Sequence, residues 1–465
     1  MKVMETTVAK DKTINKISSI NPFNGEKLKE YQLHDQSELE TIVSSSQHTF
    51  LVWKETAIAK RTKLLKKLSK VLEENKEVYG KLMVKEMGKP ISQAIAEVEK
   101  CAWLCDFYAK NAEDFLADEL IETEASESFI SYDPMGVILG VMPWNFPFWQ
   151  VFRFAIPTIT AGNTVLLKHA SNVSGCALAI EDAFKKAKYP EGCFQVLLTN
   201  HETIESLLGD HRVRAVSLTG SEEAGRKIAE IAGRNLKKAV LELGGNNACI
   251  VLADADLDTY MSVMVNARMQ NTGQSCIAAK RFIVEEAIYD AFLDRFKTEI
   301  ANLNTGNPED HTTQIGVMAK VELAKKLEQQ VEASVKKGAI VAFGNKRLDA
   351  YYQPTILTNV TEEMPVFTEE TFGPVAPVIK VKDKEAAYKM AMTTRFGLGT
   401  MVITENTEDA FERIGSIEDG AFFVNEMVKS DPRLPFGGTK ASGYGRELSK
   451  EGIMEFVNKK TVYIK

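Results

Sequence analysis

The chain of 465 residues predicts an α/β protein with more than one domain. Between residues 163 and 251, short apolar strands alternate with amphipathic helices, a pattern typical of a parallel sheet with right-handed crossovers. A second α/β unit begins after Gly245, and the length exceeds what one hydrophobic core usually serves. We therefore expect two sheets, the first of which binds its ligand beyond the carboxyl ends of its strands.

The N-terminal third begins with helices and then becomes extended. From Ala59 to about Gly80, apolar residues recur at helical spacing between lysines and glutamates, which predicts amphipathic helices. Between Ser128 and Val141 the pattern predicts strand instead.

The remaining elements follow in two groups. In the first unit, strands are expected at 164–167, 194–198, 215–218 and 238–243, and helices at 177–187 and 221–232. In the second, helix 257–272 leads into the loop of Cys276, and strand 281–284 and a helix near 319–337 follow. The final residues 461–464 alternate as a strand too short to stand alone, so we expect them to pair with a sheet edge, in this chain or in a neighbouring subunit.

Composition is that of an ordinary globular enzyme, with 44% hydrophobic residues, 26% charged residues and a formal charge of -7. This acidic balance argues against a nucleic-acid or membrane partner, because both reward clustered positive charge. The start, Met1 to Glu5, lacks the apolar stretch of a signal peptide, and no run approaches the roughly 20 apolar residues of a membrane span. We expect a cytoplasmic location.

Cys276 is the candidate nucleophile among six cysteines. A free cysteine is more often a small core hydrophobe, and the other five fit that interpretation. Together with Glu242 and Asn145, however, Cys276 supplies the thiol, carboxylate and amide donor that oxidation of an aldehyde through a thioester requires. No CxxC pair and no histidine ligand spacing occurs, so neither a disulfide framework nor a metal is expected.

Two strand ends offer groups for an elongated anion such as a dinucleotide. The usual GxGxxG is missing, but Gly220, Ser221 and Gly225 end a strand and begin a helix whose free N–H groups suit a pyrophosphate. Ser221 as a plain helix cap is the alternative. The Lys-Ser/Thr pair of a P-loop is absent there, which disfavours ATP. The second strand end carries Lys168 to Ser171, for which a surface lysine followed by a capping serine is the alternative.

With these motifs, the chain resembles the aldehyde dehydrogenase superfamily across nearly its whole length, from Asn21-Pro22-Phe23-Asn24-Gly25-Glu26 to Pro435-Phe436-Gly437-Gly438. Six motifs occur in the family's order. Three of them, beginning at Phe148, Lys168 and Gly273, are similar to the shorter bacterial succinate semialdehyde dehydrogenases.

This resemblance implies an aldehyde dehydrogenase-like α/β fold and the following parts. A Rossmann-like cofactor domain is expected at 1–117 and 135–243, a second α/β catalytic domain at 244–428, and a small β oligomerisation arm at 118–134 and 450–465. A homodimer or homotetramer is expected to form through the arm.

The resemblance also implies roles for individual residues. Cys276 is the nucleophile, Glu242 activates water, and Asn145 with the Cys276 backbone N–H forms the oxyanion hole. The cofactor is expected to contact both strand ends and the nicotinamide side of the pocket, through Trp144, Asn145, Lys168, His169, Ala170, Ser171, Gly220, Ser221, Gly225, Leu243, Glu370 and Phe372. Relatives selective for NAD commonly place a glutamate where this chain has Ser171, so we expect NADP to be preferred and NAD accepted.

Substrate choice depends on fewer residues. Arg153 lies eight residues after Asn145, where relatives specific for succinate semialdehyde place an arginine for the substrate carboxylate, although a structural ion pair is the alternative. Where these relatives carry a second arginine, this chain has Gln270. Ser430 fits their third carboxylate contact, and Arg433 is a candidate for the missing charge. Phe436 is also expected at the substrate site.

Three other functions stay open from the sequence. Within the family, the protein would act on another small aldehyde, whereas a coenzyme A-acylating form is disfavoured because Glu242 is present to recruit water. A cysteine hydrolase would need a histidine base, and no histidine lies near a candidate motif. A non-catalytic scaffold would not need the Cys, Glu and Asn set.

Overall fold

The computed structural model describes residues 16–465. The predictions that concern Met1 to Glu5, and the first 15 residues of the expected cofactor domain, lie outside this range.

The first sheet is the expected parallel one. Its order is β19-β9-β8-β5-β6-β7, with all neighbours parallel except the short β19, which pairs antiparallel with β9. The strands are β5 (Val137–Met142), β6 (Thr164–His169), β7 (Phe194–Val196), β8 (Val213–Thr219), β9 (Lys238–Glu242) and β19 (Gly443–Tyr444). The four strands expected in the first unit are therefore confirmed.

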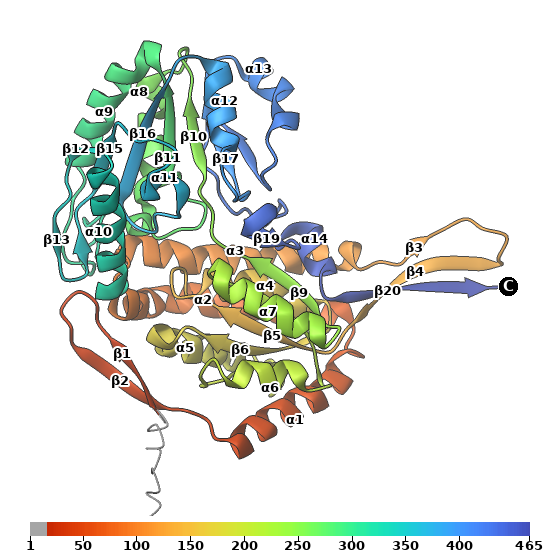
Figure 1. The fold of residues 1–465 in the computed structure, drawn as a ribbon. Coiled ribbons are helices and arrows are strands. Elements are labelled where there is room, and N and C mark those ends of the chain that lie inside the picture. Colours follow the sequence, from red (N-terminus) through yellow and green to blue (C-terminus); the bar gives the residue numbers. More distant parts are fainter. Residues whose placement is uncertain (1–15) are drawn as a thin grey trace, which may run out of the picture.

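Helices cover both faces of this sheet (Figure 1). Successive strand residues point to opposite faces. Accordingly Ile138 packs into a core with α2 to α5, while its neighbour Leu139 packs into another core with α1, α6 and α7. These helices are α1 (Gln36–Trp53), α2 (Ile58–Met87), α3 (Ile91–Phe115), α4 (Trp149–Thr160), α5 (Ser174–Lys186), α6 (Thr203–Gly209) and α7 (Glu222–Arg234).

The second sheet has the order β12-β15-β16-β11-β10-β17-β18 and is parallel except for β12. Its strands are β10 (Ala248–Val251), β11 (Arg281–Glu285), β12 (Ile340–Phe343), β15 (Thr355–Thr358), β16 (Val375–Val381), β17 (Thr400–Ile403) and β18 (Phe422–Val424). Helices α8 (Leu257–Met269) and α9 (Tyr289–Ala301) cover one face; α10 (Val321–Lys336), α11 (Pro365–Thr368) and α12 (Lys384–Met392) cover the other. An α/β fold with two sheets is thus confirmed.

One helix ends earlier than its sequence pattern predicts. The helix expected at 257–272 stops at Met269, because Asn271 and Thr272 both adopt φ of 55°. This left-handed backbone turns the chain into the loop of Cys276.

A three-stranded antiparallel arm projects from the body (Figure 1). It consists of β3 (Glu119–Leu120), β4 (Glu127–Pro134) and β20 (Val457–Ile464). The C-terminal strand pairs along its whole length with β4 of the same chain, which confirms the expected edge pairing. Assembly through this arm and the exact domain boundaries stay predictions.

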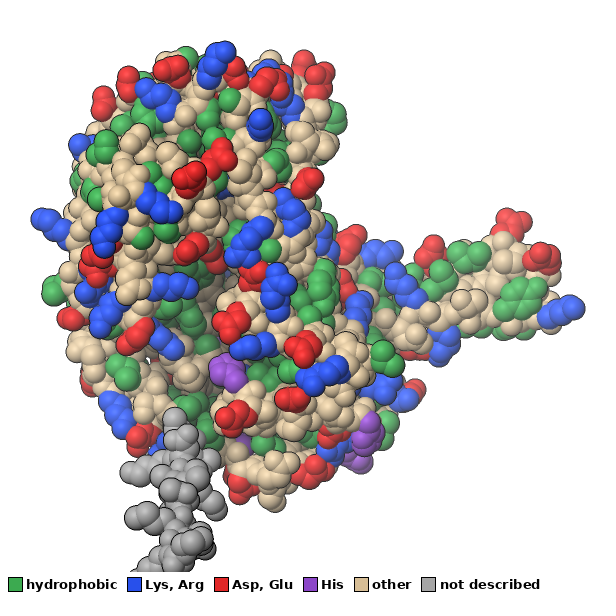
Figure 2. Space-filling view, in the orientation of Figure 1, with side chains coloured by type: hydrophobic (Ala, Val, Ile, Leu, Met, Phe, Trp, Pro, Cys, Tyr) green, Lys and Arg blue, Asp and Glu red, His purple; other side chains and the backbone are tan. Residues whose placement is uncertain are grey.

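The smaller elements complete the fold. They are the hairpins β1 (Lys16–Ile20) with β2 (Lys27–Gln32) and β13 (Arg347–Leu348) with β14 (Tyr351–Tyr352), and the helices α13 (Thr407–Glu412) and α14 (Ser449–Met454). Among the helices of residues 16–465, none combines the length and apolarity needed to cross a membrane. Side chains of both charge signs are interspersed over the face shown in Figure 2.

Candidate active site

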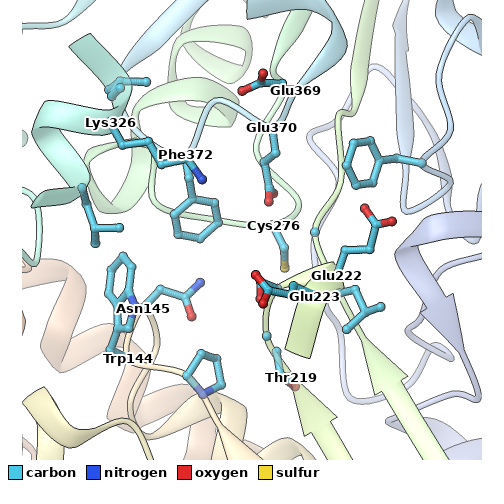
Figure 3. A pocket seen from close by; sticks show the side chains of 18 of the residues that line it. Trp144, Asn145, Thr219, Glu222, Glu223, Cys276, Lys326, Glu369, Glu370 and Phe372 are labelled. Carbon is cyan, nitrogen blue, oxygen red and sulfur yellow. The ribbon is translucent and has the colours of Figure 1, made fainter. Parts of the chain in front are cut away.

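A cavity of about 650 Å³ lies where the two sheets meet (Figure 3). The first sheet contributes the ends of β5, β8 and β9, as expected for the carboxyl edge of a parallel sheet. The second contributes the Cys276 loop, α10 and the loop before β16. The lining residues are Pro143, Trp144, Asn145, Gln150, Thr219, Gly220, Ser221, Glu222, Glu223, Leu243, Gly244, Cys276, Leu323, Lys326, Leu327, Gln330, Glu369, Glu370, Phe372, Arg395 and Phe396.

Cys276 is the one cysteine that is not fully buried, and its side chain faces the cavity (Figure 3). Its loop is held by a tight turn: Gly273 has φ of 72°, and a side chain there would meet the backbone of Gly373. Burial raises the pKa of the thiol, whereas the positive charges of Arg153 and Lys280 lower it. The thiol therefore needs these nearby cations to act as a thiolate.

Asn145 is fixed beside the cysteine loop. Its side-chain Nδ2 donates to the Gln274 carbonyl at 3.2 Å, and its own carbonyl accepts from Asn271 Nδ2 at 2.7 Å. An amide nitrogen carries two hydrogens, so one N–H stays available toward the cavity.

Glu242 ends β9, is almost completely buried and is not itself part of the cavity lining, which β9 reaches through the next residue, Leu243. Its charge nevertheless acts on the Cys276 thiol. Neither carboxyl oxygen has a hydrogen-bond partner among the described residues. Burial and the negative charge of Glu447 raise the pKa of this carboxyl well above its ordinary value, while Arg153 and Arg446 lower it. A buried carboxyl without partners costs stability, which is typical of a functional acid or base.

Arg153 pairs with a carboxylate of its own chain. Its guanidinium forms a buried ion pair with Glu447, lies 4.3 Å from the ring centroid of Phe436, and reaches Thr219 Oγ1 at 3.5 Å. The structural ion pair, which the sequence left open as an alternative, is therefore present. Contact of Arg153 with a substrate carboxylate stays a prediction, and it would compete with Glu447.

The helix terminus expected to hold the pyrophosphate lines the cavity with Gly220 and Ser221. Ser221 also caps α7, because its Oγ accepts from Ala224 N at 3.3 Å. Gly225 acts through packing: a Cβ at this position would lie 2.6 Å from Leu243 Cδ1, so the glycine lets α7 approach Leu243. The rings of Trp144 and Phe372, which also line the cavity, meet edge to face with their centroids 5.7 Å apart.

The strand end from Lys168 to Ser171 lies outside the lining of this cavity. Burial and the charge of Lys320 lower the pKa of Lys168 to about 8. His169 supports the fold: its Nε2 lies 2.9 Å from the Pro147 carbonyl, and its Nδ1 accepts from the backbone N–H of Ala170. Ser171 is exposed and makes no capping hydrogen bond, so the alternative of a plain helix cap does not hold.

The remaining substrate candidates are also outside the cavity lining. Ser430 is buried and accepts from Trp149 Nε1 at 2.9 Å and from Lys100 Nζ at 3.0 Å. Gln270 lies in the turn after α8. The structure does not bring Arg433 to the cavity, since its exposed guanidinium pairs with Asp431.

Sequence reasoning missed three charged residues of this region. Lys100, Lys280 and Glu447 read locally as ordinary surface charges, and only Lys280 had a visible signal, its place in the apolar stretch Ala278-Ala279-Lys280-Arg281-Phe282. In the fold, Lys280 and Glu447 are buried, and Lys100 contacts Ser430.

A partly exposed thiol and an amide donor in one cavity, close to a buried free carboxyl, define an enzyme that works through a covalent cysteine intermediate. The chain belongs to the aldehyde dehydrogenase family, because residues 8–462 match the sequence pattern of that family.

Individual relatives narrow the comparison. A probable succinate-semialdehyde dehydrogenase [NADP(+)] of Synechocystis is 49% identical over 96% of this chain and 99% of its own length. Succinate-semialdehyde dehydrogenase [NADP(+)] 1 of Mycobacterium tuberculosis is 44% identical over the same shares. The crystal structure of succinic semialdehyde dehydrogenase from Streptococcus pyogenes with NADP+ superposes with a TM-score of 0.94 at 34% identity, covering 96% of this chain and 99% of that one.

Proposed function

We propose that this protein oxidises succinate semialdehyde to succinate through a thioester on Cys276, with NADP as the preferred hydride acceptor. The observation that carries the proposal is the meeting of Cys276, Asn145 and Glu370 in one cavity. The named activities and cofactor of the relatives above support it. Purified protein with NADP should oxidise succinate semialdehyde faster than propanal or glyceraldehyde 3-phosphate at equal concentrations.

The residues present fit a dinucleotide. The N-terminus of α7 presents Gly220 and Ser221 to an anion. Glu370 offers a carboxylate for ribose hydroxyls, and Trp144 and Phe372 offer apolar rings near Cys276. When bound, the nicotinamide supplies the hydride acceptor.

The chain's own groups account for the other steps. The Cys276 thiolate adds to the aldehyde carbon, and Asn145 donates to the oxygen that becomes negative. After hydride loss the thioester persists until Glu242 takes a proton from water, which then attacks the acyl carbon. The C–S bond breaks, the acid leaves and the Cys276 thiolate is restored. This assignment favours an aldehyde dehydrogenase over a hydrolase, because no histidine of the described chain lines the cavity.

Lys100 supports a substrate with a carboxylate. Its ammonium lies 3.0 Å from Ser430 Oγ and 4.3 Å from the Trp149 ring centroid, and burial and the charge of Arg153 lower its pKa to about 8. Lys100 is half-buried and forms no ion pair with a carboxylate of the described residues, so its charge is available to an incoming anion. Lys100 lies outside the cavity lining, but it contacts Ser430, a proposed substrate contact, and we therefore assign it the charge that Gln270 lacks.

Lys100→Met should raise KM for succinate semialdehyde about tenfold, the equivalent of about 1.4 kcal/mol for one lost charge-assisted contact. KM for butanal, uncharged and of equal length, should stay within about twofold. Above pH 8, where Lys100 loses its proton, wild-type KM for succinate semialdehyde should rise. In the variant, KM should not rise over this pH range.

Lys110→Met on the same helix is the matched control, because Lys110 is exposed. Equal changes in KM for both aldehydes would leave Lys100 without a part in substrate choice. Arg153→Ala is a poorer probe, since it leaves Glu447 as a buried unpaired carboxylate at a cost of about 3–5 kcal/mol.

Ser171→Glu tests the cofactor preference. An added carboxylate at this exposed position should repel the 2′-phosphate, so kcat/KM for NADP should fall about tenfold or more, a factor worth about 1.4 kcal/mol. The value for NAD in the same variant is the internal control and should change by less than about twofold. A wild type that barely uses NADP, or a variant that loses both cofactors alike, would contradict this view of the pocket.

A further inference from the structure

Lys280 is a fully buried cation whose charge lowers the pKa of the Cys276 thiol, and the reaction steps above give it no further role. It lies just before β11, four residues after Cys276, and its side chain is 0% exposed. Burying an ammonium is unfavourable unless its hydrogen bonds and charge are satisfied. Its partners therefore indicate why it is there.

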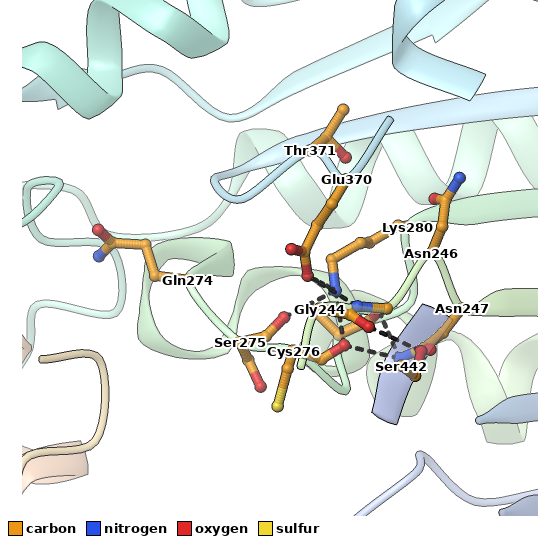
Figure 4. Close-up of polar contacts among 12 residues, drawn as sticks. Gly244, Asn246, Asn247, Gln274, Ser275, Cys276, Lys280, Glu370, Thr371 and Ser442 are labelled. Carbon is orange, nitrogen blue, oxygen red and sulfur yellow. Dashed lines mark hydrogen bonds and ion pairs between the residues drawn. The ribbon is translucent and has the colours of Figure 1, made fainter. Parts of the chain in front are cut away.

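The Lys280 ammonium has three partners: it donates to two backbone carbonyls and forms an ion pair with one carboxylate (Figure 4). Nζ lies 2.9 Å from the Ser275 carbonyl oxygen, 2.7 Å from the Cys276 carbonyl oxygen and 3.1 Å from Glu370 Oε1. One side chain thus joins the nucleophile loop to the neighbouring carboxylate of Glu370, which lines the same side of the cavity.

The contact with Ser275 reaches the proposed oxyanion hole. The Ser275 carbonyl and the Cys276 N–H belong to the same peptide group. An ammonium bound to that carbonyl polarises the peptide and makes its N–H a stronger donor, since hydrogen bonds in series reinforce one another. Its charge also lowers the pKa of the Cys276 thiol.

The contact with Glu370 fixes the carboxylate toward the cofactor. Oε1 forms the ion pair with Lys280 and accepts a hydrogen bond from the Gly245 N–H, each at 3.1 Å. Among the described residues, no hydrogen bond to Oε2 is formed, and the side chain, 22% exposed, lines the cavity. Oε2 is therefore free for a ribose hydroxyl while Oε1 stays attached to the loop of Cys276.

We propose that Lys280 is a positioning residue that couples the occupancy of Glu370 to the reactivity of Cys276. A ligand that draws the Glu370 carboxylate toward itself weakens that carboxylate's hold on the ammonium, which then acts more strongly on the Ser275–Cys276 peptide and on the thiol. The inference rests on the proposed function only in taking Glu370 as a cofactor contact and Cys276 as the nucleophile.

The loop should survive removal of the ammonium. Asn247 Nδ2 also donates to the Cys276 carbonyl at 3.0 Å, and Arg281 Nε donates to the Asn246 carbonyl at 3.0 Å. Lys280→Met keeps most of the side-chain volume, so it removes the coupling group and leaves these anchors.

The test measures two properties that need no aldehyde. Calorimetry gives Kd for NADP, and mass spectrometry gives the rate constant for alkylation of Cys276 by iodoacetamide, with and without saturating NADP. In wild type, NADP should raise the alkylation rate constant severalfold, because the ammonium then acts more strongly on the thiol. In Lys280→Met, Kd should rise about tenfold, and the ratio of the two rate constants should fall to about one.

Lys382→Met, at an exposed lysine, is the control and should match wild type in both measurements. A folded Lys280→Met protein that keeps the wild-type ratio would overturn the proposal, as would a wild-type ratio of one. Because neither measurement uses substrate, a protein that fails to oxidise succinate semialdehyde can still show the coupling, and an active one can lack it.

Glu370→Gln keeps the inference falsifiable if Lys280→Met does not fold. Glu370 raises the pKa of the Cys276 thiol, and it also holds Lys280. Without cofactor, this variant should alkylate about threefold faster or more. A Glu370 that serves only to bind ribose would leave the rate at the wild-type value, and that result would overturn the coupling.

Discussion

Cys276→Ala should lower aldehyde oxidation by about 10⁴-fold or more, because without the thiolate no covalent bond to the aldehyde forms. NADP affinity should stay within about twofold, since the groups proposed to bind the dinucleotide belong to other strand ends and to Glu370. Stopped-flow detection of NADPH should show neither a burst nor steady turnover, while calorimetry shows normal cofactor binding.

Cys249→Ala provides the matched control. This thiol is buried in β10 and lies outside the cavity lining, so its removal should cost some packing and leave turnover near wild type. Turnover of Cys276→Ala close to the wild-type rate would reject the thioester mechanism. Cofactor binding lost together with activity would instead place the thiol in the structure of the cofactor site.

The fold could be predicted where a local pattern controls it. Short continuous apolar runs are enough to locate β6, β7, β8 and β9, and apolar residues at helical spacing are enough to locate α5 and α7. The end of α8 could not be predicted, since the left-handed backbone of Asn271 and Thr272 is held by contacts with distant parts of the chain: Asn271 Nδ2 donates to the Asn145 carbonyl, and Thr272 Oγ1 accepts from the Gly316 N–H.

The site could be predicted where motif residues line the cavity directly, as Asn145, Cys276 and Glu370 do. It could not be predicted where a long-range ion pair decides the environment. Arg153 and Glu447 are 294 positions apart in the chain, and nothing near Glu447 distinguishes it from an exposed acid. Their pairing changes the interpretation of Arg153 and also sets the charge around Glu242.

Glu242→Gln should separate the two halves of the reaction. Acylation and hydride transfer precede the step that needs a base, so a burst of NADPH close to one per site should remain. Steady turnover should fall by about 10² to 10⁴-fold, the usual contribution of a general base. A lost burst with steady turnover retained would reverse the assignment and make Glu242 a group needed for acylation.

The pH profile gives a second measurement of the same carboxyl. Burial and the charge of Glu447 raise the pKa of Glu242, so it stays protonated to a higher pH than an ordinary glutamate. Since only the ionised form accepts a proton, wild-type steady turnover should fall as pH drops through this raised pKa.

Glu455 also raises the pKa of Glu242 and lies outside the cavity lining. Glu455→Gln should therefore keep turnover and move the fall in turnover to lower pH, whereas Glu242→Gln should abolish this pH dependence. If turnover of Glu242→Gln still falls at the same pH, another group titrates there. The Cys276 thiol, whose pKa is also raised, is the next candidate.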